Sequence, residues 1–215
     1  MSDMGAKSSF HHPLAEGRPI VAFDFDGTLT IRDSFTAFLR WRTGVAAWTR
    51  GLVRLTPAAL TYLHDHDRGR IKAASVRAFL MGIERETLEN EAERFAEAVW
   101  SGFMRPDALA CWNAWGERGV HRVIVTASPE TTVAPFARRL GAENLIGTRL
   151  AFDSQDRVAG AFLGENCRGE EKMNRLRAVY GPEVRLAAAY GDTSGDAQMI
   201  AAAVEKGYRV FTARP

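Results

Sequence analysis

Two aspartates, Asp24 and Asp26, stand at the end of an apolar run in the sequence IVAFDFDGTLT, which covers Ile20–Thr30. Removing a carboxylate from water costs several kcal/mol, and two neighbouring carboxylates repel each other. Such a pair indicates that a cation binds there. On an extended chain the two side chains point in opposite directions, so we expect each to have its own chemical role. Gly27 permits a tight turn directly after them.

A second pair, Asp192 and Asp196, lies in YGDTSGDAQMI. Asp192 follows another apolar run and is placed to complete a site for a hard cation with Asp24. Mg²⁺ is typically held by carboxylates, together with water and phosphate oxygens, and a backbone carbonyl suits the same ion. Two interpretations of Asp196 stay open: it supports the cation, or it interacts favourably with a helix dipole.

Lys172 lies in GEEKMNRL, near the start of a predicted helix. A positive charge is unfavourable at this end of a helix. The position therefore indicates a specific anion close by, with a solvated lysine as the alternative.

The elements that must position these residues alternate between strands and helices. We expect strands at Ile20–Phe25, His121–Ser128, residues 184–192 and residues 208–211, and a hairpin that pairs residues 144–152 with Val158–Leu163. We expect helices at Pro129–Leu140, Glu170–Val179, Gly195–Val204 and after Arg105, the last one capped by Asp107. Residues 33–101 have a helical pattern throughout. The pattern predicts an α/β fold, a Rossmann-like core with a mostly parallel sheet and an all-helical insertion at residues 31–105.

Three of these strands end in polar residues. Asp24 and Asp26 end the first strand, Thr126 and Ser128 end the second, and Asp192 follows the strand at residues 184–192. In an open parallel sheet, ligands bind beyond the carboxyl ends of the strands. We therefore expect these side chains to meet at one edge of the sheet.

The ordered motifs DFDGT, VIVTAS, Lys172 and GDTSGD resemble the four motifs of the haloacid dehalogenase-like (HAD) superfamily. The helical insertion after the first motif resembles the type-one cap of its phosphoserine-phosphatase-like subfamily. The resemblance implies a HAD-like core at residues 20–30 and 106–215 and a helical cap at 31–105. It covers the chain from about Ile20 onward. Residues 1–19 have no apolar core segment, which favours a flexible lead-in over a secretory signal.

The resemblance also implies a role for each residue. Asp24 would be the nucleophile that forms an aspartyl-phosphate, and Asp26 the general acid and base. Thr126 and Ala127 would bind phosphoryl oxygens, with Ser128 lining the pocket, and Lys172 would offset charge beside the nucleophile. Mg²⁺ would be held by Asp24, the backbone carbonyl of Asp26 and Asp192, with Asp196 in support. The implied activity is a Mg²⁺-dependent phosphomonoesterase, and the rival of another class is a non-catalytic binding protein that keeps the fold.

Composition excludes several other classes of protein. The chain has 215 residues, of which 46% are hydrophobic, so it is not disordered throughout. Its net charge of +2 and the lack of a recognised motif argue against nucleic acid as a partner. Cys111 and Cys167 are far apart and lack zinc-site spacing, which favours reduced thiols in a cytoplasmic protein. No stretch is long and apolar enough for a membrane span, so any membrane contact would be peripheral.

Charge within the insertion is segregated. Residues 32–77 hold nine Lys or Arg and three Asp or Glu, whereas residues 84–97 hold two and six. Such a pattern usually marks a solvated face, and the alternative is that the basic half attracts an anionic substrate. Arg70 and Lys72 are candidates to bind a second anionic group of such a substrate. Trp41 and Trp48, with Arg40, Arg42, Arg50 and Arg54 around them, also suit an anionic membrane surface, although core packing explains both tryptophans. His64 and His66 are best explained by a polar turn.

The substrate is open. The sequence VTASPE stands where phosphoserine phosphatases have Ser-Gly-Gly, and in this it looks nearest to the branch with phosphatidylglycerophosphate phosphatases. A soluble phosphomonoester, a lipid phosphate and phosphoserine remain alternatives.

Overall fold

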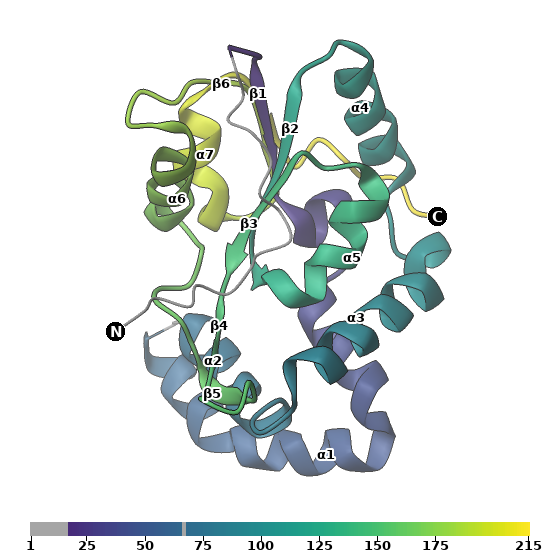
Figure 1. The fold of residues 1–215 in the computed structure, drawn as a ribbon, viewed down its shortest axis with the longest axis vertical. Helices are drawn as coiled ribbons and strands as arrows, with labels where there is room; N and C mark the ends of the chain where they lie inside the picture. The colour runs from purple at the N-terminus through teal and green to yellow at the C-terminus, as the bar shows by residue number, and fades with distance from the viewer. Residues whose placement is uncertain (1–16, 66–67) are drawn as a thin grey trace.

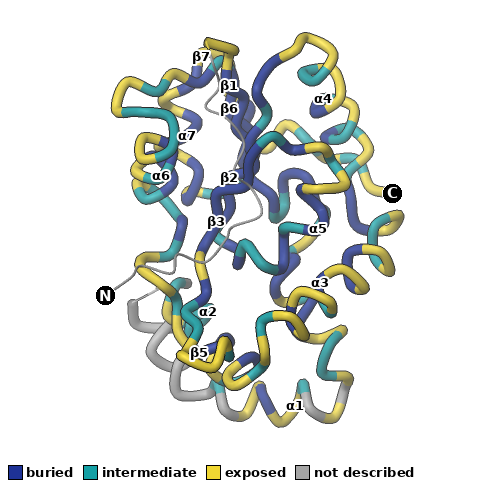
Figure 2. The backbone as a smooth tube through the Cα atoms, in the orientation of Figure 1, coloured by how far each residue is buried: buried dark blue, intermediate teal, exposed yellow. Residues whose placement is uncertain are grey.

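A five-stranded parallel sheet forms the centre of the protein, with the strand order β3-β2-β1-β6-β7. The computed structural model describes residues 17–65 and 68–215. The strands are β1 (Ile20–Phe23), β2 (His121–Pro129), β3 (Asn144–Thr148), β6 (Leu186–Gly191) and β7 (Ala203–Tyr208). Figure 2 shows the buried part of the backbone concentrated along β1, β2 and β6. The α/β fold with a parallel sheet, expected from the alternating pattern, is confirmed.

Helices cover both faces of the sheet (Figure 1). β1 is central and its side chains alternate between the faces, so Val21 and Phe23 pack in one core cluster and Ile20 and Ala22 in the other. The first cluster includes residues of α4 (Pro106–Glu117) and α5 (Glu130–Leu140), and the second includes residues of α6 (Glu170–Tyr180) and α7 (Ala197–Ala201). Both faces are buried, which explains the uninterrupted apolar sequence of β1.

The segment between Thr30 and Arg105 contains only helices among its described residues. They are α1 (Ser34–Asp65), α2 (Arg68–Phe79), α3 (Arg85–Val99) and the short 3₁₀ helix η2 (Trp100–Gly102). The backbone of α1 is interrupted at Gly44, where φ is +67°. These helices lie together beyond one end of the sheet (Figure 1). No described helix is long and apolar enough to cross a membrane.

The backbone that enters this helical segment and the backbone that leaves it lie side by side. Thr30 forms a bridge with Met104, and the Arg105 N–H donates to the Leu29 carbonyl at 2.9 Å. The Arg105 Nε also donates to the carbonyls of Gly27 and Thr30, at 3.1 and 3.2 Å. One arginine therefore fastens the junction to the turn that follows β1.

An antiparallel hairpin connects the core to the helices. It consists of β4 (Leu150–Phe152) and β5 (Val158–Phe162). The expected hairpin is therefore confirmed only for the second part of the run at residues 144–152, because residues 144–148 form β3 and pair with β2 in the parallel sheet. The Gly82 N–H donates to the Val158 carbonyl, and the Val158 N–H donates to the Ile83 carbonyl, each at 2.8 Å. The loop between α2 and α3 is thus hydrogen-bonded to β5.

Two local predictions are wrong. The last strand is Ala203–Tyr208 instead of residues 208–211, and the preceding helix ends at Ala201 instead of Val204. β7 is an edge strand, so most of its side chains are exposed and it lacks the apolar run used to locate it. Its buried Gly207 leaves room for the Tyr190 ring, which would lie 2.1 Å from an added β-carbon.

Asp107 is not the cap of α4. Arg105 is the capping residue and Pro106 starts the helix. The Asp107 Oδ2 instead accepts the N–H groups of Thr212 and Ala213, at 2.7 and 2.9 Å. The carboxylate fixes the end of the chain against the start of the helix.

Candidate active site

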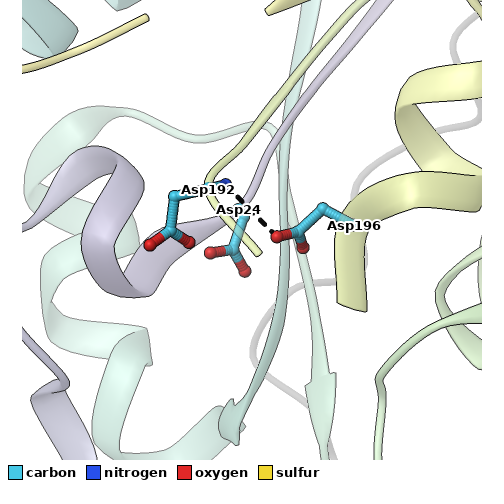
Figure 3. A group of neighbouring side chains, drawn as sticks. All are labelled: Asp24, Asp192 and Asp196. Carbon is cyan, nitrogen blue, oxygen red and sulfur yellow. Dashed lines mark hydrogen bonds between the residues drawn. The ribbon is translucent and has the colours of Figure 1, made fainter. Parts of the chain in front are cut away.

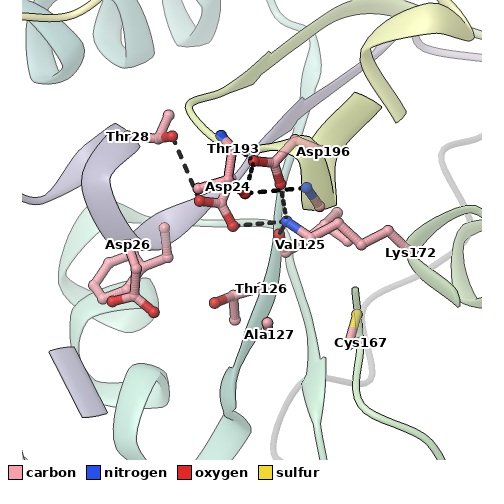
Figure 4. A network of polar contacts seen from close by, with 12 residues as sticks. Asp24, Asp26, Thr28, Val125, Thr126, Ala127, Cys167, Lys172, Thr193 and Asp196 are labelled. Atoms are coloured by element: carbon pink, nitrogen blue, oxygen red, sulfur yellow. Dashed lines mark hydrogen bonds and ion pairs between the residues drawn. The ribbon is translucent and has the colours of Figure 1, made fainter. Parts of the chain in front are cut away.

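Asp24 lies directly after β1 and is buried, with 6% of its surface exposed. Its N–H donates to the Tyr190 carbonyl at 2.8 Å, so its backbone is fixed to β6. Its Oδ1 accepts a hydrogen bond from Lys172 Nζ at 2.6 Å, and its Oδ2 accepts one from Thr28 Oγ1 at 3.4 Å (Figure 4). The end of the central strand thus presents a carboxylate in a fixed orientation.

The turn after Asp24 requires glycine at its third position. Gly27 has φ of +80°, a conformation that other residues rarely adopt. A β-carbon there would also lie 2.2 Å from Asp192 Oδ2. Gly27 therefore allows both the turn and the close approach of Asp192.

Lys172, on the first turn of α6, is 1% exposed and lies beneath Asp24. Its Nζ donates to Asp24 Oδ1, to Asp196 Oδ1 and to the Val125 carbonyl, each at 2.6 Å (Figure 4). Burial alone would lower the pKa of Lys172, but the charges of Asp24 and Asp196 outweigh it and raise the pKa. Lys172 therefore lies as a cation between two carboxylates. These carboxylates are the nearby anions that its position at the start of a helix predicted.

Burial also controls Asp24. It raises the pKa of Asp24 to about 7, although the charge of Lys172 acts in the opposite direction. A cation beside the carboxylate would favour the ionised form. The site is thus arranged so that a bound cation increases the fraction of ionised Asp24.

Among the described residues, one group of three or more His, Cys, Asp or Glu side chains is close enough together to hold a metal ion. It consists of Asp24, Asp192 and Asp196. One oxygen from each lies within 4.8 Å of the others, and Asp24 stands between the other two in Figure 3. Asp192 Oδ1 is buried without a hydrogen-bond partner, and burial and the charge of Asp196 raise the pKa of Asp192. A buried, unpartnered carboxylate oxygen beside a second carboxylate fits a divalent cation such as Mg²⁺.

Asp196 is held differently from the other two. Its Oδ1 accepts from Lys172, and its Oδ2 accepts from the N–H and hydroxyl of Thr193 at 2.9 and 3.0 Å. Thr193 and Asp196 form a reciprocal capping box around Ser194–Asp196. Burial acts to raise the pKa of Asp196, but Lys172 and these hydrogen bonds lower it. The carboxylate orders the loop that carries Asp192.

Asp26 points away from Asp24 and has separate partners. Its Oδ1 accepts the N–H of Ser34 at 2.7 Å, and its Oδ2 accepts the hydroxyl of Ser128. Burial and the charge of Asp33 raise the pKa of Asp26, while Lys72 opposes the rise. The expectation that the two aspartates do not share one proton agrees with these contacts.

Thr126, Ala127 and Ser128 lie in the last part of β2, where the pairing with β3 is irregular between Val125 and Pro129. The Ser128 N–H donates to Thr126 Oγ1 at 3.1 Å, and Thr148 Oγ1 donates to the Ala127 carbonyl at 2.9 Å. Thr126 and Ala127 stand beside the two aspartates of the first motif in Figure 4. These contacts hold the segment at the end of β2 on both sides of the irregularity.

The helical segment also contributes to the site. Lys72 on α2 donates to Ser128 Oγ at 3.2 Å and pairs with Asp33 at 3.7 Å. Arg70 is exposed on the same helix, so its role stays a prediction. The side chains of Arg54 and His64 and all of His66 lie outside the described residues.

Some contributors or contacts were not identified from sequence. Ser34 donates to Asp26, eight residues before it, and no motif in the sequence singled it out. Lys72 was a candidate for substrate binding, but its contact with Ser128 joins residues far apart in the chain and leaves no local pattern. Thr193 had a usable signal, since the spacing Thr-x-x-Asp is typical of a capping box.

Comparison with known proteins agrees with this geometry. Residues 21–201 match the family described as haloacid dehalogenase-like hydrolase. Protein CicA from Caulobacter vibrioides is 56% identical over 205 residues, covering 95% of this chain and 90% of CicA.

Two solved structures have the same fold. A protein of unknown function from Bordetella pertussis Tohama I has a TM-score of 0.72 and 22% identity, with 86% of each chain covered. A phospho-aspartyl intermediate analogue of phosphoserine phosphatase has a TM-score of 0.56 and 19% identity, covering 86% of this chain and 83% of that one. With the family match and the CicA identity, these findings show that the chain belongs to the haloacid dehalogenase-like hydrolase family.

Proposed function

We propose that the protein is a Mg²⁺-dependent phosphomonoesterase and that Asp24 is its nucleophile. The observation that carries this proposal is the shared hydrogen bonding of Asp24 and Asp196 to Lys172, beside an Asp192 oxygen that has no partner. This arrangement offers a carboxylate nucleophile, a fixed cation and ligands for a second cation. This combination suits phosphoryl transfer, which depends on positioning and on neutralising oxygen charge.

The reaction has two steps. In the first, an Asp24 oxygen forms a bond to phosphorus, the ester P–O bond breaks, and Asp26 gives a proton to the departing oxygen. In the second, Asp26 takes a proton from water, the water oxygen bonds to phosphorus, and the bond from phosphorus to Asp24 breaks. The separate partners of Asp24 and Asp26 support this division of roles.

The same geometry suggests which residues hold the substrate and the metal. Lys172 and Thr126 would bind phosphoryl oxygens or offset their charge, with the Ala127 N–H beside them. Asp24, Asp192 and the Asp26 carbonyl would hold Mg²⁺, with Asp196 ordering the loop. Mg²⁺ supplies charge neutralisation on the phosphoryl oxygens when it is bound.

We further propose that residues 20–30 and 106–215 are the catalytic core and residues 31–105 a helical cap. The paired backbone at Thr30 and Met104 supports a junction between two units. Lys72 and Ser34 extend from the helical unit to the site, which supports a part in substrate binding or positioning.

The nucleophile is tested with Asp24→Asn. The amide has the same shape and is not nucleophilic, so we expect hydrolysis of p-nitrophenyl phosphate to fall by about 10⁴-fold or more. A retained circular dichroism spectrum and a cooperative melting transition serve as the control for folding. Equal hydrolysis by the variant and the parent would overturn the assignment, and an inactive parent would favour the non-catalytic alternative.

A lipid phosphate is the second candidate substrate. Trp41, Leu52 and Val53 on α1 are 40%, 44% and 73% exposed, and Arg50 is exposed beside them, which suits an anionic surface. Trp48 contributes less to this surface, because its ring stacks on that of Phe79, with 5.2 Å between the ring centroids. A panel of phosphatidylglycerophosphate, phosphatidate, phosphoserine and sugar phosphates, with and without anionic vesicles, distinguishes these substrates. Preference for a soluble ester, unaffected by vesicles and by Arg50→Glu, would remove the lipid candidate.

A further inference from the structure

A chain of hydrogen bonds runs from the helical segment to Asp26. It begins at Lys72 on α2, passes through the hydroxyl of Ser128 at the end of β2, and ends at the Asp26 carboxylate. The three residues come from three segments that are far apart in the sequence. The chain therefore exists only while α2 is packed against this end of the sheet.

While Asp26 is ionised, the direction of each hydrogen bond is fixed by chemistry. An ammonium group only donates, and an ionised carboxylate only accepts. Ser128 has one hydroxyl proton, so while it accepts from Lys72 Nζ at 3.2 Å it gives that proton to Asp26 Oδ2. Lys72 thus holds the Ser128 hydroxyl in the orientation that binds Asp26.

The other oxygen of Asp26 is fixed from the same side. Asp26 Oδ1 accepts the N–H of Ser34, the first residue of α1, at 2.7 Å. Lys72 is itself held by Asp33 at 3.7 Å, and its side chain is only 19% exposed. Both Asp26 oxygens therefore depend on residues at the start of α1 or on α2.

We propose that Lys72 and Ser128 are positioning residues that hold the Asp26 carboxyl group for proton transfer to the leaving oxygen. The proposal rests on the function proposed above, in which the Asp26 proton passes to the ester oxygen as its bond to phosphorus breaks. The Lys72 side chain, which reaches Ser128 from α2, completes the arrangement of the proton donor, so the helical segment contributes to catalysis as well as to binding.

Comparing esters with different leaving groups shows whether the proton donor has been displaced. An alkoxide is a poor leaving group and needs the proton, whereas p-nitrophenolate leaves without it. A misplaced Asp26 therefore slows hydrolysis of an alkyl phosphate more than hydrolysis of p-nitrophenyl phosphate. A general loss of structure would slow both reactions equally.

The test compares kcat/KM for these two kinds of ester in Ser128→Ala and Lys72→Met. We expect an alkyl phosphate such as glycerol phosphate to lose at least about 10-fold more than p-nitrophenyl phosphate, because a general acid contributes roughly 10²- to 10⁴-fold. Ser128→Thr keeps the hydroxyl and should restore most of the alkyl ester activity. Ser154→Ala and Lys206→Met, both at exposed positions remote in sequence from these residues, are the matched controls.

A second measurement uses an Asp26→Asn background. If Ser128 acts through Asp26, adding Ser128→Ala to Asp26→Asn should change kcat/KM less than twofold. If the parent is active, equal losses of kcat/KM for both esters in the variants would overturn this proposal alone. Full additivity of Ser128→Ala and Asp26→Asn would do the same. A parent that hydrolyses no phosphate ester would overturn the proposed function and this inference together.

Discussion

A β-carbon on Gly27 would stand 2.2 Å from Asp192 Oδ2, so the turn after β1 and the loop after β6 fit together only when this residue is glycine. Asp192 is the aspartate whose Oδ1 is buried without a hydrogen-bond partner. The absence of one side chain thus determines where a carboxylate of the candidate metal site can lie.

Gly27→Ala should weaken the metal site. A non-glycine residue in the left-handed region costs about 1–2 kcal/mol, and the added carbon must also displace Asp192. We expect the Mg²⁺ concentration needed for half-maximal activity to rise at least about 10-fold, as measured by Mg²⁺ titration of p-nitrophenyl phosphate hydrolysis. The matched control is Gly119→Ala, where φ is +69° and nothing lies within 4 Å of the added carbon. An equal Mg²⁺ requirement in both variants would contradict this explanation.

Lys172→Met should destabilise the fold. It leaves Asp24 and Asp196 buried without their cation, and breaking a buried ion pair in this way typically costs about 3–5 kcal/mol. Urea unfolding at pH 7 without Mg²⁺ measures the loss. Adding Asp196→Asn should recover part of it, because one of the unpaired charges is removed. A loss below about 1 kcal/mol, or strict additivity of the two substitutions, would contradict a role for Lys172 in neutralising both carboxylates.

The sequence predicted which strands meet at the site because the rule for parallel sheets is geometric and general. Asp24, Thr126 and Asp192 come from β1, β2 and the loop after β6, which are neighbours in the sheet. Once the strands were identified from their apolar runs, the meeting of these residues followed. The edge strand β7 was misplaced because it is mostly exposed and has no such run.

Other features depend on distance in space and were not predictable. The turn at Gly27 was expected, but the approach of Asp192 to it was not, since the two residues are far apart in the sequence. The contact of Lys72 with Ser128 likewise depends on how α2 is held near the end of β2 by its packing on α1 and β5. For Asp196, both interpretations stay open, because one of its oxygens lies within 4.8 Å of the candidate ligand atoms of Asp24 and Asp192, and its side chain also completes a capping box at a helix start.

Cys167 should make stability depend on pH in the alkaline range. Burial raises the pKa of its thiol to about 11, from an ordinary value of 9.0. Between these values the unfolded chain loses the proton and the folded protein keeps it, so this contribution to stability is present below pH 9 and is lost as pH rises toward 11. The expected loss is roughly 2–3 kcal/mol across that window. Urea unfolding of the parent and of Cys167→Ala at pH 8 and pH 10.5 isolates the contribution of this thiol. A difference in the free energy of unfolding between the two proteins that is the same at both pH values would contradict the prediction.

Asp107 should control the order of the chain's end. Its Oδ2 accepts the N–H groups of Thr212 and Ala213, and the Ala213 carbonyl accepts from Arg105, the residue that also binds the Gly27 carbonyl. Asp107→Ala should therefore increase amide hydrogen exchange at Thr212 and Ala213 at least about 10-fold, because both acceptor contacts are lost.

The same contact should depend on pH. Burial acts to raise the pKa of Asp107, but the backbone hydrogen bonds, chiefly from Ala213 and Thr212, together outweigh it and lower the pKa. A lowered pKa means that the contact is intact above the ordinary pKa of an aspartate and is lost as pH falls through the folded value. After correction for intrinsic exchange, protection of Thr212 and Ala213 should fall in acid in the parent and stay low at every pH in Asp107→Ala. Protection that is equal in the two proteins at neutral pH would show that other contacts hold the end of the chain.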